Sequence, residues 1–319
     1  MKFLERSLDQ QNQFWKYLVV ILVAFFGGQI IGAIPLICVI AAKVASNGGA
    51  SITDMTNPTD LTIFGISKNL SLFLMMIPFI VSFILLVILI KGLHKRSLSE
   101  TVNGTNKVRI SRFWTGMAVW GLLMVIYLLG DYMINPDNFV LQFDLANFIP
   151  LLLISILIIP IQTTFEELLC RGYLAQGIAG WTKNRWAVII LPGLFFALLH
   201  IGNPEVKEYG FWMAMPQYLF FGLLFGFVAV LDDGIELPMG MHAANNVFLS
   251  IFATNKSSAL QTNAIFEQLN INPVRETIIL VIMGIIAIAY FAWKYKWNFR
   301  ILSEKVTAED KTEEGMLLS

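Results

Sequence analysis

Long apolar runs separated by short polar segments dominate the chain. A transmembrane helix needs about 20 predominantly apolar residues, and about eight runs qualify or come close. They cover residues 17–43, 70–90, 113–134, 149–169, 187–202, 211–231, 237–253 and 276–293. The ranges 187–202 and 237–253 are the shortest, and each contains a histidine.

These runs are expected to be helices, because a backbone polar group in lipid must be satisfied within its own segment. The alternating ten-residue pattern of membrane β-barrels is absent from the sequence. We therefore predict an all-α, polytopic bundle of about eight transmembrane helices.

Composition supports a membrane protein. Hydrophobic residues make up 56% of the chain and charged residues 14%, whereas soluble domains carry about 25% charged residues. The net charge is zero, which gives no reason to expect a nucleic-acid partner. Cys38 and Cys170 form neither a disulfide framework nor a zinc-ligand pattern.

The basic residues predict the orientation. The loop 91–112 is rich in lysine and arginine, whereas 44–69 and 135–148 together hold only Lys68. Basic loops stay in the cytoplasm, so both termini are expected there, in a protein of the cell membrane. The first apolar run exceeds the roughly 7–15 residues of a signal peptide and is expected to be a retained span.

The chain divides into four predicted segments. The first spans carry no recognisable motif. The next spans carry the polar motifs described below, and a last loop with a last span and a polar tail expected to be disordered follow them. Their ranges are 1–148, 149–253, 254–302 and 303–319.

Three polar clusters interrupt the apolar runs of the second half. A charge in the centre of a membrane helix costs about 2.5–3.5 kcal/mol, so such residues usually face a cavity and serve a function. Residues four apart share one face of a helix, which fits an ion pair within the first cluster. The clusters are Glu166-Glu167-xxx-Arg171, Phe196-xxx-His200 and His242-xxx-Asn246.

The first two clusters are expected to meet at similar depth. Residue 183 is the midpoint between Glu166 and His200, and it lies in the polar stretch 182–185. If the two helices form an antiparallel hairpin about that turn, both side chains reach one level of the bundle.

Together the clusters can support hydrolysis. A carboxylate shielded from water can act as a general base near neutral pH, and an imidazole beside it can orient the attacking water. A second imidazole and an amide can donate hydrogen bonds to an oxyanion. No GxSxG or SxxK motif competes for the nucleophile, so water is the simplest one.

The three motifs, in this order, resemble those of the CAAX-protease and bacteriocin-processing family of intramembrane proteases, over roughly residues 149–253. The resemblance implies a glutamate-dependent endopeptidase without a metal or other cofactor, in a cavity that opens towards the cytoplasm. By that resemblance Glu166 activates water with His200, and His242 and Asn246 form the oxyanion hole.

The same resemblance implies that Glu167, Arg171 and Phe196 support the site. The expected partners are membrane lipids and a peptide or protein substrate, with or without an attached lipid.

Two alternatives remain open. Glu166, His200 and His242 could be ligands of a catalytic zinc, although HExxH is absent. Alternatively, the polar residues could serve a transporter or a non-catalytic scaffold by holding helices together.

Overall fold

The computed structural model describes residues 2–9, 11–47, 57 and 59–308. Its secondary structure is almost entirely helical, which confirms the predicted all-α membrane bundle. In chain order the elements are α1 (Phe14–Val20), α2 (Gly28–Asn47), α3 (Lys68–Leu89), α4 (Leu98–Asn103), α5 (Ile110–Ile134), β1 (Phe139–Leu141), α6 (Leu145–Leu157), α7 (Ile159–Glu167), α8 (Ala175–Thr182), α9 (Arg185–Leu199), α10 (Pro204–Tyr209), α11 (Phe211–Leu231), α12 (Glu236–Phe252), β2 (Ala253–Thr254), β3 (Phe266–Gln268) and α13 (Pro273–Tyr295).

Short π-helical and 3-10 segments complete these elements. π-Helical turns, Ile21–Gly27, Ile90–His94 and Leu168–Leu174, join α1 to α2, extend α3 and join α7 to α8. Such turns are rare and frequently occur at functional sites, and Leu168–Leu174 directly follows the two glutamates of the first motif. The 3-10 helices are Glu5–Leu8, Leu61–Phe64, Pro136–Asn138 and Phe299–Ser303.

In the described part of the chain, 6 helical rods are long and apolar enough to cross a membrane. They are Phe14–Ser46, Lys68–His94, Ile110–Ile134, Leu145–Thr182, Phe211–Leu231 and Pro273–Tyr295. Each rod overlaps one predicted span. The two remaining predictions, 187–202 and 237–253, correspond to α9 and α12, which have 15 and 17 residues.

α12 falls short because of where it packs, whereas α9 keeps an exposed apolar face that includes Ile190, Leu194 and Leu198. Nearly every residue of α12 is buried, against α5, α7 and α6 among others, and α9 packs along α11. A helix enclosed by other helices can be shorter and more polar than one that faces lipid. The number of complete spans therefore lies between six and the expected eight.

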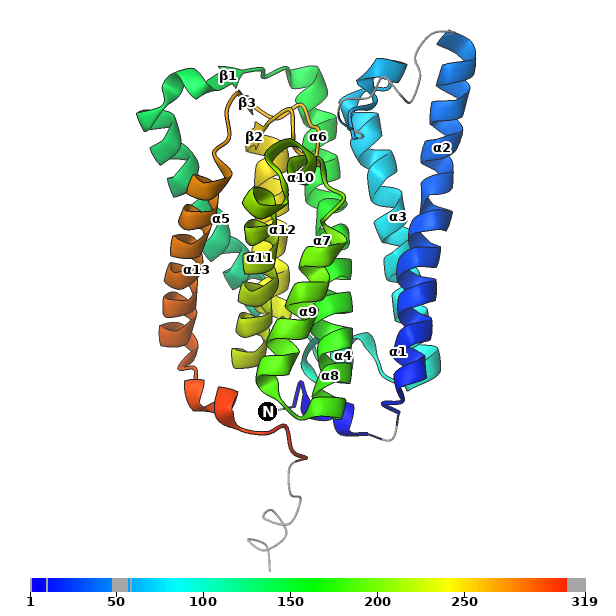
Figure 1. The fold of residues 1–319 in the computed structure, drawn as a ribbon, viewed down its shortest axis with the longest axis vertical. Helices are drawn as coiled ribbons and strands as arrows, with labels where there is room; N and C mark the ends of the chain where they lie inside the picture. Colours follow the sequence, from blue (N-terminus) through cyan, green and yellow to red (C-terminus); the bar gives the residue numbers. More distant parts are fainter. Residues whose placement is uncertain (1, 10, 48–56, 58, 309–319) are drawn as a thin grey trace, which may run out of the picture.

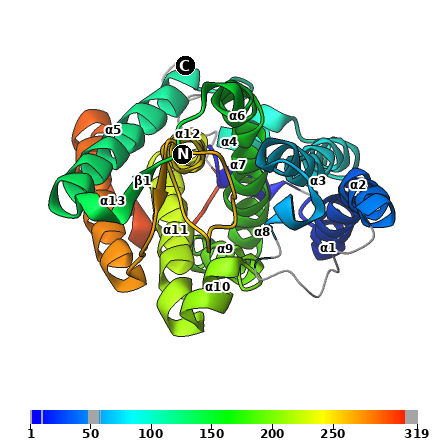
Figure 2. The same cartoon turned by 90° about the horizontal axis from the view of Figure 1, so that it is seen from above.

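The helices form one bundle with two flanks. α5 and α13 lie on one flank and α1–α3 on the other, with α7, α9, α11 and α12 between them (Figures 1 and 2). Glycines let two pairs of helices approach closely. Gly193 of α9 meets Gly222 of α11, and Gly240 of α12 meets the backbone of Phe113 in α5, where a Cβ atom would clash.

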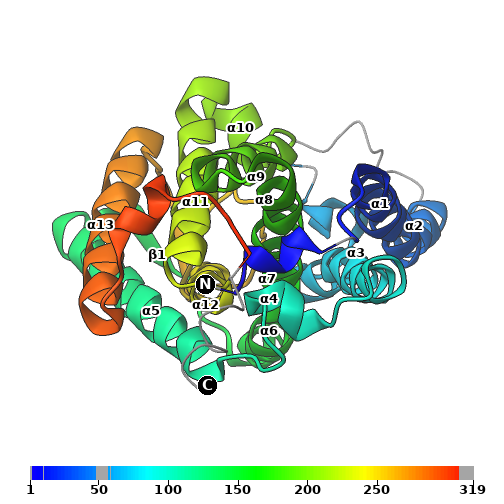
Figure 3. The ribbon, with the colours of Figure 1, turned by 90° about the horizontal axis from the view of Figure 1, so that it is seen from below.

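One end of the bundle, here called the basic end, comprises residues 2–8, 95–109, 182–185, 232–236 and 296–306. Gln176 donates hydrogen bonds to the carbonyl oxygens of Phe3, at 3.1 Å, and Glu100, at 2.9 Å. Arg109 pairs with Glu236 at 2.6 Å. Figure 3 shows the N-terminal segment lying across this end beside α4.

The opposite end, here called the sheet end, comprises residues 57, 59–66, 135–144, 200–210 and 253–272. Its small sheet has the order β1-β3-β2, with β3 antiparallel to β1 and parallel to β2. Asn57 donates to the carbonyl oxygen of Lys256 at 2.9 Å, which ties the loop before α3 to the loop after α12. The hydrophobic pattern does not reveal these short strands.

Residues 303–308, the described part of the tail that was expected to be disordered, pack on the bundle. Val306 is fully buried, and its amide donates to the carbonyl oxygen of Lys183 at 3.0 Å. Lys305 bridges to Asn184, so the turn between α8 and α9 fixes the start of the tail. Residues 309–319 lie outside the described residues.

Candidate active site

The three motifs converge on one cavity of about 480 Å³. Glu166 ends α7, His200 follows the last residue of α9, and His242 and Asn246 lie on successive turns of α12. All four side chains line the cavity. The polar turn at Lys183, which has φ 54°, closes the α8–α9 hairpin, as the depth argument requires.

Glu166 lines the cavity with a mostly buried side chain. Its side chain is 13% exposed, and Oε2 lies 3.6 Å from Nε2 of His242. Oε2 is buried and has no hydrogen-bond partner among the described residues. A carboxylate in this state can accept a proton from a water molecule in the cavity.

Glu167, in contrast to Glu166, accepts hydrogen bonds from other side chains. Its side chain is fully buried, and Oε1 accepts hydrogen bonds of 2.8 Å from both Arg171 Nη1 and His242 Nδ1. The predicted ion pair at a spacing of four residues is therefore present. It also links α7 to α12, so one carboxylate orients both the arginine and a cavity imidazole.

Arg171 secures this network to α11 and α9. Its Nη2 donates to the carbonyl oxygens of Phe221, at 3.3 Å, and Gly222, at 3.1 Å. The guanidinium lies 4.2 Å from the ring centre of Phe196, a cation–π contact. Phe196 thus supports the site by packing on the buried cation.

The hydrogen bonds fix the imidazole tautomers. His200 Nδ1 lies 2.7 Å from the carbonyl oxygen of Phe196, which can only accept, so Nδ1 carries a proton. The His200 ring stacks on Tyr218 at 4.5 Å, and Nε2 is left to accept a hydrogen bond. Similarly, Nδ1 of His242 donates to Glu167, and its Nε2 faces Glu166.

A chain of amides holds Asn246. Trp120 Nε1 donates to Asn245 Oδ1 at 3.3 Å, and Asn245 Nδ2 donates to Asn246 Oδ1 at 3.2 Å. Asn246 Nδ2 in turn donates to Gln162 Oε1 at 3.1 Å. Both oxygen and nitrogen of Asn246 are therefore oriented, and one N–H of its amide remains for a ligand.

Several residues that line the cavity were not predicted from the sequence. Gln162 lies four residues before Glu166, and this helical spacing was the one signal that could have revealed it. Tyr218, which stacks on His200, lies beside Gln217 in the mostly apolar helix α11, and no helical spacing relates it to one of the three motifs. The wall also includes Phe25 and Met75, from spans without a motif.

Glu205 is a second cavity acid, on α10 at the sheet end. Burial raises the pKa of its carboxyl group, although a 2.8 Å hydrogen bond from the amide of Ala259 acts in the opposite direction. Among the described residues that line the cavity there is no lysine or arginine. The charged side chains in the lining are therefore acidic, apart from any protonated histidine.

The described residues do not form a ready-made zinc site. Among the described residues, no group of three histidine, cysteine, aspartate or glutamate side chains is placed to hold a metal ion. His242 Nδ1 and His200 Nδ1 are both engaged in hydrogen bonds, so a metal would have to bind through Nε2. Metal dependence stays a hypothesis that chelation can test.

Comparisons with known proteins agree with the motifs. Residues 145–248 match the family model of Rce1-like proteins, described as type II CAAX prenyl endopeptidase Rce1-like. The chain is also 28% identical over 293 residues to the uncharacterized protein YyaK of Bacillus subtilis (strain 168), covering 91% of this chain and 95% of that protein. No solved structure matches.

The matched segment runs from α6 through most of α12 and contains every residue of the three motifs. Several apolar spans and this protease-type family identify an integral membrane protein. The resemblance predicted from the three motifs is therefore confirmed over residues 145–248, the segment that matches the Rce1-like family model.

Proposed function

We propose that this protein is an intramembrane endopeptidase that hydrolyses a peptide bond with a water molecule activated by Glu166. One observation carries the proposal. Of the two adjacent glutamates, the fully buried Glu167 is paired through Oε1 with Arg171 and His242, although its Oε2 lacks a partner among the described residues. The partly exposed Glu166, in contrast, lines the cavity and accepts no hydrogen bond from the described residues. A structural carboxylate would be paired, and an unpaired one in a membrane cavity is available for proton transfer.

The proposed reaction begins with deprotonation of water. Glu166 takes one proton as the water oxygen attacks the substrate carbonyl carbon, and Nε2 of His200 accepts the second O–H as a hydrogen bond. The tetrahedral intermediate carries its negative charge on the former carbonyl oxygen. When the C–N bond breaks, the protonated Glu166 returns its proton to the leaving amine, and a carboxylic acid and an amine are released.

His242 and Asn246 are proposed to stabilise the oxyanion. Because Nδ1 of His242 already donates to Glu167, Nε2 can donate only when the ring carries two protons. The arginine-paired Glu167 accepts the Nδ1 proton of His242 and thereby orients the imidazole towards the cavity. The free N–H of Asn246 provides the second donor.

The cavity sets limits on the substrate. Its volume of about 480 Å³ lies within the usual range for ligand pockets, and its wall is rich in apolar side chains such as Phe25, Phe79 and Met76. An extended peptide segment with apolar residues fits such a wall. An attached lipid is an optional addition that the assay below separates from the peptide itself.

The test is cleavage of a fluorogenic peptide panel by the purified protein in detergent. Each peptide is used with and without a farnesyl group, and with and without a zinc chelator. Cleavage that survives chelation supports the glutamate mechanism. Activity that is lost on chelation and restored by zinc supports the metalloprotease alternative, in which Glu166, His200 and His242 bind the metal.

Replacing one oxyanion donor is expected to slow the chemical step. Asn246→Ala removes the free amide N–H, and loss of such a donor costs about 10²–10³ in kcat. The expected result is a fall of about 10²-fold in kcat with little change in KM, measured by steady-state cleavage. A change confined to KM would contradict this role.

Asn245→Ala is the matched control for Asn246→Ala. It removes an amide from the adjacent position, which contacts Asn246 and Trp120 and makes no proposed contact with the oxyanion. We expect a clearly smaller loss of kcat from this variant. Equal losses would mean that both amides act only by holding α12 in place.

A further inference from the structure

The cavity extends from Glu166 towards the sheet end of the bundle. Its rim includes Thr59, Glu205 and Ser258, which are partly exposed. Thr59 Oγ1 donates to the carbonyl oxygen of Ser258 at 3.3 Å, which joins two of the rim segments. Among the described residues, none from the basic end contributes to the lining.

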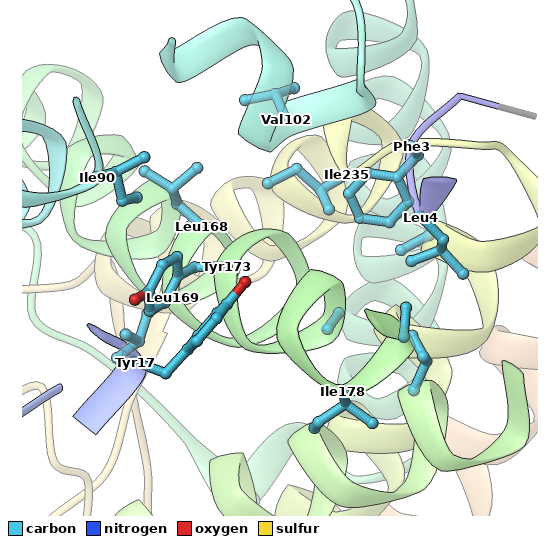
Figure 4. Close-up of a cluster of buried hydrophobic side chains, with 14 of the residues drawn as sticks. Phe3, Leu4, Tyr17, Ile90, Val102, Leu168, Leu169, Tyr173, Ile178 and Ile235 are labelled. Carbon is cyan, nitrogen blue, oxygen red and sulfur yellow. The ribbon is translucent and has the colours of Figure 1, made fainter. Parts of the chain in front are cut away.

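Towards the basic end the cavity is closed by packed side chains. Leu168, Leu169 and Tyr173, which follow Glu166 along the rod, are at most 1% exposed. Figure 4 shows that residues of the N-terminal segment, α4 and the loop before α12 gather around the same rod. The rod from Glu166 to Gln176 is about 15 Å long at about 1.5 Å per residue, so this plug is thick.

The distribution of basic residues assigns the two ends to the two sides of the membrane. Most of the described lysines and arginines lie at or near the basic end, including Lys91, Lys95, Lys107, Lys183, Lys294 and Lys296. The sheet end has fewer, Lys207 and Lys256, and Arg275 just beyond it forms a 2.8 Å ion pair with Asp131. Short loops rich in lysine and arginine remain in the cytoplasm, so the basic end is the cytoplasmic one.

We propose that substrate enters this cavity from the non-cytoplasmic side of the membrane. The inference rests on the proposed function and adds the substrate class: neutral or cationic peptide segments exposed outside the cytoplasm or at the outer membrane surface. It reverses the cytoplasmic opening that the family resemblance implies. The plug at the basic end leaves the sheet end as the route by which a peptide reaches Glu166.

Variants with one introduced cysteine test this direction without any need for activity, and the background that retains only Cys170, which is buried but lines the cavity, is treated in parallel as the labelling control. The background is Cys38→Ser, because Cys38 is exposed, whereas Cys170 is buried and is kept. Three positions are compared: Met75→Cys in the cavity wall, Lys256→Cys beside the rim and Asn106→Cys at the basic end. Intact cells are treated with a small, charged thiol reagent that does not cross membranes.

We expect the cysteines at positions 75 and 256 to react in intact cells, and the cysteine at position 106 to react only after the cells are permeabilised. Reaction of position 106 in intact cells would show that the basic end lies outside and overturn the orientation. A cysteine at position 75 that reacts only from the cytoplasm, or from neither side, would overturn the access route.

Vesicles of known sidedness separate this inference from the proposed function. Right-side-out and inverted vesicles are given an impermeant peptide that the detergent-solubilised protein cleaves. Cleavage by right-side-out vesicles supports the access route, and cleavage by inverted vesicles alone contradicts it while leaving the endopeptidase activity intact. Failure of every peptide in detergent would count against the proposed function, and the cysteine labelling would still decide the direction.

Discussion

Glu166→Gln is expected to lower kcat/KM for peptide cleavage by about 10³-fold while leaving the protein folded. The amide has the shape of the carboxylate but cannot take a proton from water, and general base catalysis typically contributes about 10²–10⁴-fold. Folding should survive, because Oε2 of Glu166 has no hydrogen-bond partner among the described residues that the substitution would break. Cleavage kinetics and thermal unfolding in detergent are the two measurements.

Glu208→Gln is the matched control for this prediction. Glu208 lies on α10, is exposed and does not line the cavity, so its replacement changes the charge of the protein by the same amount. Its kinetics should equal those of the wild type. Undiminished cleavage by a well-folded Glu166→Gln would end the glutamate–water mechanism.

Arg171→Met is expected to destabilise the protein by about 3–5 kcal/mol, the cost of breaking a buried ion pair by removing one partner. Glu167 is fully buried and would keep only the hydrogen bond from His242. The carbonyl oxygens of Phe221 and Gly222 would also lose their side-chain donor. The expected observation is a large fall in the thermal unfolding temperature.

The double variant Arg171→Met, Glu167→Gln shows whether the lone charge is the cause. It removes the uncompensated carboxylate, while the side-chain oxygen of glutamine can still accept from Nδ1 of His242. We expect it to recover much of the lost stability, which gives a large interaction energy in a double-mutant cycle. Strictly additive losses would show that the arginine acts mainly by packing on Phe196.

The positions of the spans and the convergence of the motifs could be predicted because both depend on local rules. Apolar run length marked the rods, and the polar turn at Lys183 set the hairpin that brings Glu166 and His200 to one cavity. The spacing of four residues between Glu167 and Arg171 was enough to predict their ion pair. The roles assigned to these residues in catalysis stay predictions.

Contacts between distant segments could not be predicted in the same way. Asp131 pairs with Arg275 across 144 positions, and Gln176 binds the carbonyl oxygen of Phe3 across 173 positions. No spacing rule relates such residues. The cavity wall from α3 and the plug from the N-terminal segment therefore required three-dimensional information, and with them the direction in which the cavity faces.

The π-helical segment Leu168–Leu174 also has a consequence for comparing relatives of different length. A π-helical turn accommodates about one residue more than an α-helical turn, so removal of a single residue can leave the flanking helices in the same phase. Such a deletion would have to fall after Arg171 to preserve its spacing from Glu167. A one-residue gap at Gly172–Leu174 in a sequence alignment would thus mark an evolutionary variant with the same active site, rather than a broken motif.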